Sequence, residues 1–182
     1  MNQFVVRPIK LTDVPSLSKV YLSLSEEDRK MFHPFPFELW KVLPIMIIIS
    51  ISPVFNEFAR RAFPQLVWLP LVAHDPAANM IAGFGFVHFK KRFSNGEYLV
   101  DLGIMTVKAY RRREIGSKLM RNLITLSSQN KASIISLTVL SENNAAISLY
   151  QRFGFKFVAK VSNRWAGQSY PAYDMELGTR RQ

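Results

Sequence analysis

Apolar residues alternate with polar ones in some parts of the chain and recur every three to four positions in others. The alternating and continuous apolar runs predict β-strands. Helical spacing predicts helices from about residue 12 to 24, from Ile115 to about Gln129, and from Asn143 to a stop at Gly154. Asn95-Gly96 is a strong hairpin signal between two strands, and Gly103 suggests a bulge or a close approach. The predicted strands cover residues 4–9, 66–73, 81–93, 98–107, 134–140, 157–161 and 170–177.

Between the first helix and the second strand, residues 38–63 are predicted to be helical in two pieces, with Pro44 and Pro53 as starts or kinks. Residues 42–55 within this region carry no charge. This apolar tract is shorter than the roughly 20 residues that a membrane-spanning helix needs. We therefore expect a protein that does not span a membrane, with residues 42–54 buried in the core or in a homodimer interface.

Composition places the chain among ordered globular proteins, because 48% of its residues are hydrophobic and 20% are charged. Its 182 residues suit a single domain over 1–182. The chain has no cysteine, which excludes disulfide scaffolds, cysteine-ligated metal sites and a cysteine nucleophile. A cytoplasmic location fits this composition. His33, His74 and His88 lack metal-ligand spacing, so no metal is expected.

Charge is strongly unbalanced, with 24 basic and 13 acidic residues and a net charge of +11. Such a field attracts nucleic acid, an acidic membrane surface or a phosphorylated cofactor, although it can also serve solubility alone. No aromatic RNA-binding motif accompanies the charge, so a nucleic-acid partner is not favoured.

A run of three arginines lies where the strand ending at Val107 turns into the helix starting at Ile115. The first amides of a helix have no acceptor within the helix and form the positive end of the helix dipole, so this turn can bind an anion. Adjacent arginines increase its attraction for phosphate. A solvated basic loop is the simpler alternative reading of the same residues.

This segment resembles the acetyl-CoA-binding motif of the GNAT N-acetyltransferase superfamily, Q/R-x-x-G-x-G/A. Arg111 fills its first position and Gly116 its last, whereas Glu114 replaces the middle glycine. The resemblance implies main-chain contacts from Met105 and Val107 to the pantetheine arm of the cofactor. It also implies a pyrophosphate cradle formed by Arg112, Arg113, Glu114, Ile115, Gly116 and Ser117.

A second segment, from Asn143 through Ala146 and Tyr150 to Gly154, is similar to the N-x-x-A-x-x-L-Y-x-x-x-G-F element of the same superfamily. Asn143 and Tyr150 are seven residues apart, about two helical turns, so they share one face of a helix. The resemblance implies that Asn143 and Ala146 contact the cofactor. It also implies that Tyr150 gives a proton to the departing thiolate, although Tyr150 can equally be a core residue.

Acetyl transfer to an amine requires a group that collects the proton of that amine. Asp101 lies six residues before Val107, close to where some members of the superfamily carry a glutamate base. We expect Asp101 to act through a water molecule, with Glu97 as a weaker candidate and a solvent-facing aspartate as the plain alternative. Aromatic residues that could line an acceptor groove are Phe35, Phe37, Trp40, Trp165, Tyr170 and Tyr173.

These features together predict an α/β protein of the GNAT-like fold, with a mostly antiparallel sheet of six to seven strands flanked by about four helices. The expected activity is acetyl-CoA-dependent acetylation of a primary amine, on a protein N-terminus, a lysine or a small molecule, by direct attack in a ternary complex. The alternative is a catalytically quiet module of the same fold that binds CoA or an acidic partner such as RNA. The sequence does not choose among the acceptors.

Overall fold

A computed structural model of the protein describes residues 4–31, 65 and 67–179. The predicted helices over residues 38–63, the apolar tract at 42–55 and its proposed dimer contact lie outside these residues. So do His33, Phe35, Phe37 and Trp40.

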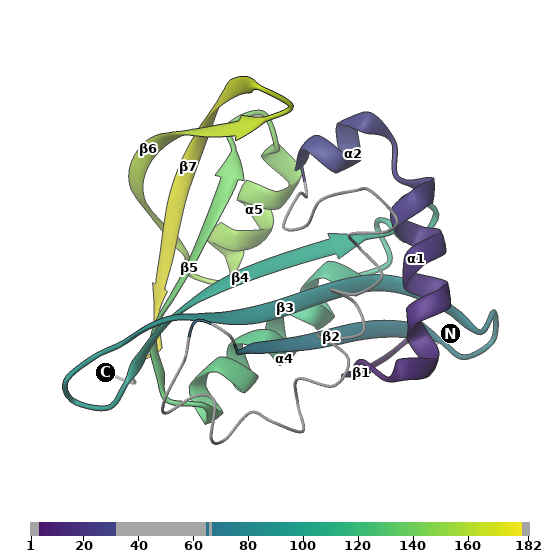
Figure 1. The fold of residues 1–182 in the computed structure, drawn as a ribbon, viewed down its shortest axis with the longest axis horizontal. Helices are drawn as coiled ribbons and strands as arrows, with labels where there is room; N and C mark the ends of the chain where they lie inside the picture. The colour runs from purple at the N-terminus through teal and green to yellow at the C-terminus, as the bar shows by residue number, and fades with distance from the viewer. Residues whose placement is uncertain (1–3, 32–64, 66, 180–182) are drawn as a thin grey trace.

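The described residues form one seven-stranded sheet in the order β1-β2-β3-β4-β5-β7-β6 (Figure 1). Only the pairing of β4 with β5 is parallel, and the other neighbouring strands are antiparallel. The predicted, mostly antiparallel mixed sheet is therefore confirmed. The strands are β1 (Val5–Pro8), β2 (Trp68–Asp75), β3 (Met80–Arg92), β4 (Tyr98–Thr106), β5 (Ala132–Leu140), β6 (Lys156–Trp165) and β7 (Gln168–Gly178).

Four α-helices flank the sheet in the described part of the chain, and α1, α4 and α5 follow the order among the strands that the sequence predicts. Helix α1 covers one face, whereas α4 and α5 lie against the other face (Figure 1). The helices are α1 (Val14–Ser23), α2 (Glu26–Met31), α4 (Ile115–Gln129) and α5 (Asn144–Arg152). Two 3₁₀ turns, η1 (Leu11–Asp13) and η3 (Lys108–Tyr110), precede α1 and α4.

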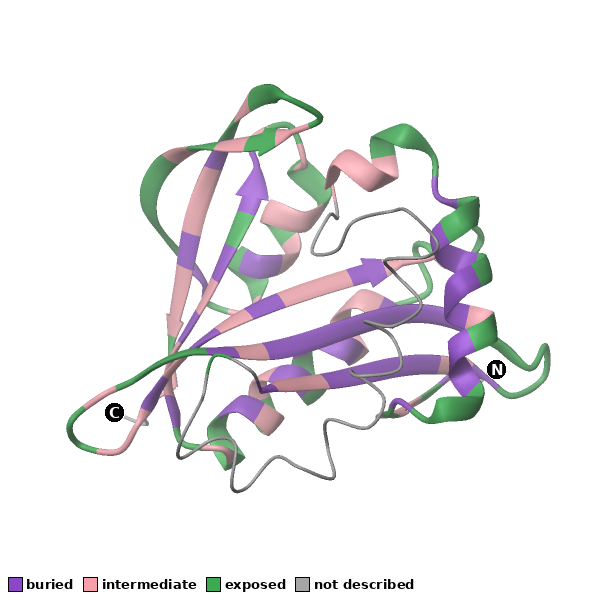
Figure 2. Cartoon of the chain, in the orientation of Figure 1, coloured by how far each residue is buried: buried purple, intermediate pink, exposed green. Residues whose placement is uncertain are grey.

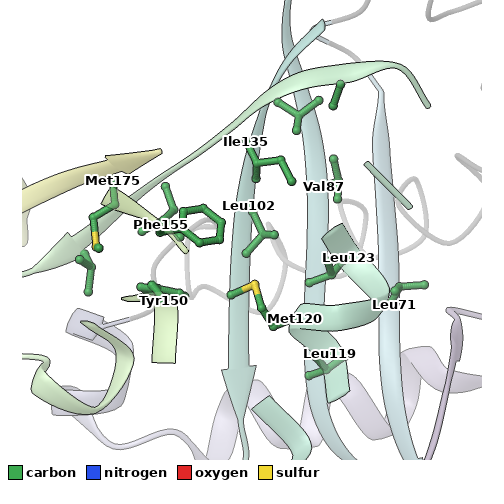
Figure 3. Close-up of a cluster of buried hydrophobic side chains, with 14 of the residues drawn as sticks. Leu71, Val87, Leu102, Leu119, Met120, Leu123, Ile135, Tyr150, Phe155 and Met175 are labelled. Carbon is green, nitrogen blue, oxygen red and sulfur yellow. The ribbon is translucent and has the colours of Figure 1, made fainter. Parts of the chain in front are cut away.

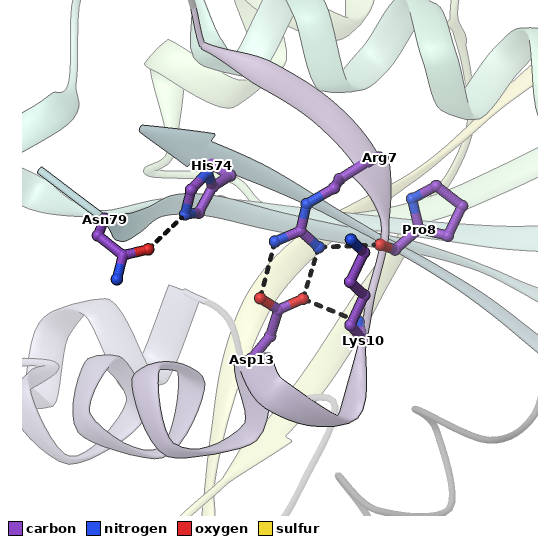
Figure 4. A network of polar contacts seen from close by, with 6 residues as sticks. All are labelled: Arg7, Pro8, Lys10, Asp13, His74 and Asn79. Carbon is purple, nitrogen blue, oxygen red and sulfur yellow. Dashed lines mark hydrogen bonds and ion pairs between the residues drawn. The ribbon is translucent and has the colours of Figure 1, made fainter. Parts of the chain in front are cut away.

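The start of α1 is fixed by an ion pair between Arg7 of β1 and the buried Asp13. Asp13 accepts two hydrogen bonds from the Arg7 guanidinium, at 2.6 and 2.8 Å, and one from the Lys10 amide at 2.8 Å (Figure 4). Burial opposes ionisation of Asp13, but these donors outweigh it and lower the pKa of its carboxyl. The ion pair thereby joins β1 to the first turn before α1.

The core has two parts, one on each face of the sheet (Figure 2). The larger part packs α4 and α5 against the sheet, and the smaller part packs α1 against the opposite face. Helix α4 approaches β3 closely at two glycines. A Cβ atom on Gly83 would lie 2.9 Å from Ile115 Cγ2, and one on Gly85 would lie 2.7 Å from Leu123 Cδ1. These glycines allow the helix to rest directly on the strand.

Most local sequence signals match the structure. Gly96 and Gly154 both have positive φ angles, at the predicted hairpin and at the end of α5. Of the two alternatives at Gly103, the bulge is wrong, because the pairing of β3 with β4 is regular there and shifts instead between Phe89 and Lys91. The close approach is confirmed, since a Cβ atom on Gly85 would lie 3.1 Å from the Gly103 carbonyl oxygen. Helix α2 was not predicted.

No helix in the described ranges combines the length and apolar character needed to cross a membrane.

Candidate active site

The two central strands separate in the middle of the sheet. Strands β4 and β5 pair over Tyr98–Asp101 and Ala132–Ser136, and their register ends there. Strand β4 nevertheless continues to Thr106 and β5 to Leu140, and Figure 1 shows them diverging. Backbone groups of β4 beyond Asp101 that point toward β5 therefore have no pairing with β5. These free amides and carbonyls can form hydrogen bonds with an extended ligand that lies beside β4, in the way that a neighbouring strand would. We call this feature the β4–β5 opening.

Backbone direction along β4 decides which residues can bind such a ligand. The Val107 amide donates to the Ala82 carbonyl of β3 at 3.0 Å, so it points away from the β4–β5 opening. Because alternate residues of a strand bond to opposite sides, the Met105 amide also faces β3. The main-chain groups that face the opening are those of Ile104 and Thr106. The expected main-chain contacts of Met105 and Val107 thus do not fit this hydrogen bonding.

The turn between β4 and α4 has the conformation of an anion-binding loop. Arg112 and Glu114 both adopt left-handed backbone conformations, with φ angles of 62° and 60°. The first helical hydrogen bond runs from the Lys118 amide to the Glu114 carbonyl at 2.9 Å. The amides of residues 115–117 therefore have no intrahelical acceptor, as at every helix start. Glu114 keeps the conformation that a glycine at this position would favour.

The three arginines of this turn differ in what their side chains contact. The Arg111 guanidinium pairs with Asp28 of α2 and reaches the Thr106 carbonyl at 3.4 Å. The Arg113 guanidinium lies 5.6 Å from the centre of the Tyr110 ring. Arg112 is exposed. Arg112 and Arg113 are thus better placed than Arg111 to receive a phosphate.

Gly116, the last motif position, brings α4 close to α5. A Cβ atom there would lie 3.3 Å from Leu149 Cδ2 and 3.8 Å from Thr106 Oγ1. A larger residue at position 116 would be crowded, because α4, β4 and α5 meet at this point. The predicted turn and the predicted second motif are adjacent in the structure.

Asn143 has a different structural role from the one implied by the resemblance. Its Oδ1 atom accepts a hydrogen bond from the Ala146 amide at 3.2 Å, so Asn143 is the N-cap of α5. Asparagine is among the preferred N-cap residues because its side-chain oxygen satisfies an unpaired helical amide. Only the amide end of this side chain is left for a contact with an extended ligand.

Tyr150 lies in the larger core cluster, on the side of the sheet that α4 and α5 cover (Figure 3). It is 6% exposed, and its ring centre is 5.9 Å from that of Phe155. Burial raises the pKa of the Tyr150 hydroxyl well above its ordinary value. Burial thus keeps the hydroxyl protonated and makes it a weaker acid than an exposed tyrosine, and the ring lies in the core, as the alternative interpretation of Tyr150 expects.

Asp101 lies at the closed end of the β4–β5 opening, where it is the last residue of β4 that pairs with β5. The Lys90 ammonium is 3.5 Å from Asp101 Oδ2, and the Ser136 hydroxyl donates to Oδ1 at 3.4 Å. Burial raises the pKa of the Asp101 carboxyl, although Lys90, His88 and Ser136 act in the opposite direction. Asp101 thus lies at the closed end of the β4–β5 opening, with a carboxyl that takes up a proton more readily than an ordinary aspartate.

Glu97, the weaker candidate, is four residues before Asp101 in the β3–β4 hairpin. The Asn95 side-chain amide donates to Glu97 Oε2 at 2.9 Å. The hairpin is at the end of β4 away from the β4–β5 opening, so Glu97 is a turn residue.

Helix α2 connects the two sides of the β4–β5 opening. Asp28 pairs with Arg111 in the β4–α4 turn, and Lys30 pairs with Glu142 in the β5–α5 loop. The Lys30 ammonium also lies 4.3 Å from the centre of the Tyr170 ring. Tyr170, one of the aromatic candidates for an acceptor groove, is therefore near the opening. The signal for α2 was Ser25, whose hydroxyl accepts a hydrogen bond from the Asp28 amide at 3.1 Å, three positions later.

Metal chemistry receives no support from side-chain clusters. Among the described residues, no group of three or more His, Asp or Glu side chains is arranged to hold a metal ion.

Comparison with known proteins identifies the family of the chain. The family model for the acetyltransferase (GNAT) family matches residues 47–155. Since this match spans more than half of the 182 residues, the chain belongs to the acetyltransferase (GNAT) family. No curated protein matches the sequence.

Solved structures of low sequence identity share the fold. The yncA protein of Salmonella typhimurium, solved with acetyl-CoA, has a TM-score of 0.71 at 16% identity and covers 100% of this chain and 96% of its own. Arabidopsis thaliana NAA60 with a bisubstrate analogue has a TM-score of 0.71 at 18% identity, covering 97% and 98%. The ribosomal-protein-alanine N-acetyltransferase of Brucella melitensis has a TM-score of 0.69 at 16% identity, covering 96% and 99%. The predicted GNAT-like fold is thus confirmed.

Proposed function

We propose that this protein is an acetyl-CoA-dependent N-acetyltransferase that acts on a primary amine in a ternary complex, as one domain over residues 1–182. The observation that carries the proposal is the β4–β5 opening, which has the anion-binding turn at its open end and Asp101 at its closed end. Proteins that share the fold include the Brucella melitensis ribosomal-protein-alanine N-acetyltransferase, which supports an amine acceptor.

The residues present fit acetyl-CoA. The amides of residues 115–117, with Arg112 and Arg113, would hold the diphosphate. The main chain of Ile104, the main-chain amide of Thr106 and the amide end of Asn143 would bind the pantetheine arm. The acetyl thioester would then lie at the closed end of the opening.

The chemistry follows from this placement. The amine nitrogen attacks the thioester carbonyl carbon, a carbon–nitrogen bond forms, and the carbon–sulfur bond breaks. Asp101 accepts the proton that the amine loses. Tyr150, kept protonated by burial, supplies a proton to the departing thiolate.

Titration calorimetry with acetyl-CoA, and then with free CoA, tests the binding part of the proposal. Replacing Arg112 and Arg113 together by Ala should raise the dissociation constant and flatten its dependence on salt. Arg164→Ala, in β6, is the matched control and should change neither. An unchanged constant for the double variant would show that these arginines do not bind the phosphates.

Thiol release from acetyl-CoA in the presence of a panel of amines tests the chemistry. Asp101→Asn, which keeps the shape of the side chain, should lower kcat about 10²-fold or more, the low end for general-base catalysis. Glu97→Gln is the control and should retain activity. Tyr150→Phe should lower kcat by a similar factor while the affinity for acetyl-CoA stays the same. If none of these variants differs from the wild type, both roles are wrong.

A catalytically quiet module that binds CoA is the second candidate, and one observation favours it. Glu114 places an exposed carboxylate where the motif has a glycine, next to the proposed diphosphate site. Acetyl-CoA binding without turnover of any amine in the panel would support this second function. A cytoplasmic location and a homodimer remain predictions.

A further inference from the structure

Four side chains form a row across the sheet at the closed end of the β4–β5 opening. Trp68 of β2 is opposite His88 of β3, His88 is opposite Asp101 of β4, and Asp101 is opposite Ser136 of β5. Directly opposite residues point to the same face of a sheet and have Cβ atoms about 5 Å apart. The row lies on the face that α1 covers, because Trp68 packs against the core cluster of α1.

The His88 ring is held in one orientation. It stacks on the Trp68 ring, with the ring centres 4.1 Å apart and the planes at 18°. Its Nε2 atom is 2.8 Å from the Gln65 carbonyl oxygen. A carbonyl can only accept a hydrogen bond, so Nε2 carries the proton. In the neutral ring the Nδ1 atom is therefore the free base.

Two charged groups in the described part of the chain act on His88. Asp101 faces it from β4, and Lys90 is two residues further along β3. Burial has the largest effect and lowers the pKa of His88, the hydrogen bond to the Gln65 carbonyl and the charge of Asp101 raise it, and Lys90 lowers it. The ring is thus neutral at rest, next to a carboxylate that stabilises the imidazolium once a proton arrives.

We propose that His88 is a positioning residue for acetyl transfer, which holds on its Nδ1 atom the proton that Asp101 removes from the acceptor amine. As the carbon–nitrogen bond forms, the amine proton passes to the Asp101 carboxylate. It then moves through a water molecule to His88, which faces Asp101 across the strand pair, and leaves to solvent after the product departs. Asp101 is thereby returned to its basic form for the next turnover. This inference rests on the proposed function.

The first test does not require an acceptor. Nuclear magnetic resonance of the imidazole groups in the full-length protein follows the titration of His88, with His88→Gln identifying its signal. Asp101→Asn should lower the pKa of His88, and Lys90→Gln should raise it. The His74 signal is the reference, because its partner on β3 is Ile81, roughly 23 Å along that strand from His88. An unchanged titration of His88 in Asp101→Asn overturns the pairing.

The second test measures kcat and KM against pH with the amine panel. His88→Gln can still donate to the Gln65 carbonyl but cannot hold a proton. We expect kcat of His88→Gln to fall about tenfold or more, while KM for acetyl-CoA stays unchanged. The rise of kcat on the acidic side of the pH profile should also shift to a different pH. His74→Gln is the matched control and should resemble the wild type. Thermal melting of both variants checks that they are folded.

The outcomes separate the two proposals. If the wild type acetylates amines and His88→Gln has the same kcat and pH profile, the role of His88 is overturned and the proposed function stands. If the wild type acetylates no amine although it binds acetyl-CoA, the proposed function fails and the proton transfer fails with it.

Discussion

Glu114 is the residue whose replacement tests most directly how the β4–α4 turn binds an anion. Its φ and ψ angles are 60° and 7°, in the left-handed region. A residue with a Cβ atom loses about 1–2 kcal/mol in that conformation. Glycine removes this cost but gains unfolded-state entropy of about 0.4–1 kcal/mol. Glu114→Gly should therefore raise the free energy of unfolding by no more than about 1.6 kcal/mol.

The second expected effect is on the affinity for acetyl-CoA. A carboxylate about 7 Å from a diphosphate charge is repelled by about 0.6 kcal/mol in water, from Coulomb's law. Two such charges give about 1.2 kcal/mol, which salt at physiological strength reduces to less than about 1 kcal/mol. Removing the carboxylate should thus tighten acetyl-CoA binding by about three- to fivefold.

Calorimetric titration of three proteins separates charge from backbone. Glu114→Gln removes the charge alone, and Glu114→Gly also frees the backbone. The gain for Glu114→Gln should shrink at high salt, whereas any extra gain for Glu114→Gly should not. Glu97→Gln, at the far hairpin, controls for net charge. Weaker binding by Glu114→Gln would refute the reasoning, because it would mean that the carboxylate supports the turn.

Three further predictions concern the scaffold. Gly83→Ala should lower the free energy of unfolding by about 2 kcal/mol in denaturant melts, because its Cβ atom would lie 2.9 Å from a backbone oxygen; Gly178→Ala, with nothing within 4 Å, should be nearly neutral. Asp13→Asn should cost about 2 kcal/mol at pH 7, since Arg7 loses its charged partner. Folding lowers the pKa of Asp13, so the stabilisation by the Arg7–Asp13 pair is fully present above the ordinary pKa of 3.8. This stabilisation is lost as pH falls through the lower pKa of the folded state, and thermal melts at a series of pH values measure the loss. Asp28→Ala should speed amide hydrogen exchange in α2 about two- to fivefold, as expected for an exposed ion pair.

Elements with local signals could be predicted from the sequence. Helix α4 was predicted from Ile115 to about Gln129, and these are its observed ends. Its apolar residues recur at helical spacing, so the pattern contains both its position and its buried face. The hairpin at Asn95-Gly96 is a similar case, since the φ of +82° at Gly96 is a requirement of the turn itself.

Relations between strands could not be predicted in the same way. The pairing of His88 with Asp101 depends on the register of β3 and β4, which shifts between Phe89 and Lys91. A shift of one residue changes which side chains share a face. For the same reason the sequence could not show that the Val107 amide bonds to β3 rather than facing the β4–β5 opening.

Helix α2 escaped prediction because it is short and has no buried residue. Apolar periodicity, the main signal for a helix, is therefore missing. Its local signals are weak, namely the Ser25 cap and an acidic first turn. Asp28 and Lys30 pair with distant parts of the chain, Arg111 and Glu142, so tertiary ion pairs support the helix that joins the two sides of the candidate site.

The close packing of α4 on β3 links the stability of the fold to the geometry of the site. A Cβ atom added at Gly83 would have as its nearest neighbours Ile115, the first residue of α4, and the Met105 carbonyl of β4. The start of α4 is therefore held against the same part of the sheet from which the β4–α4 turn leaves. A side chain at Gly83 would push on the helix at the point where its free amides begin. Gly83, which pairs with Thr106 in the sheet, thus helps to set where the β4–α4 turn lies relative to the β4–β5 opening.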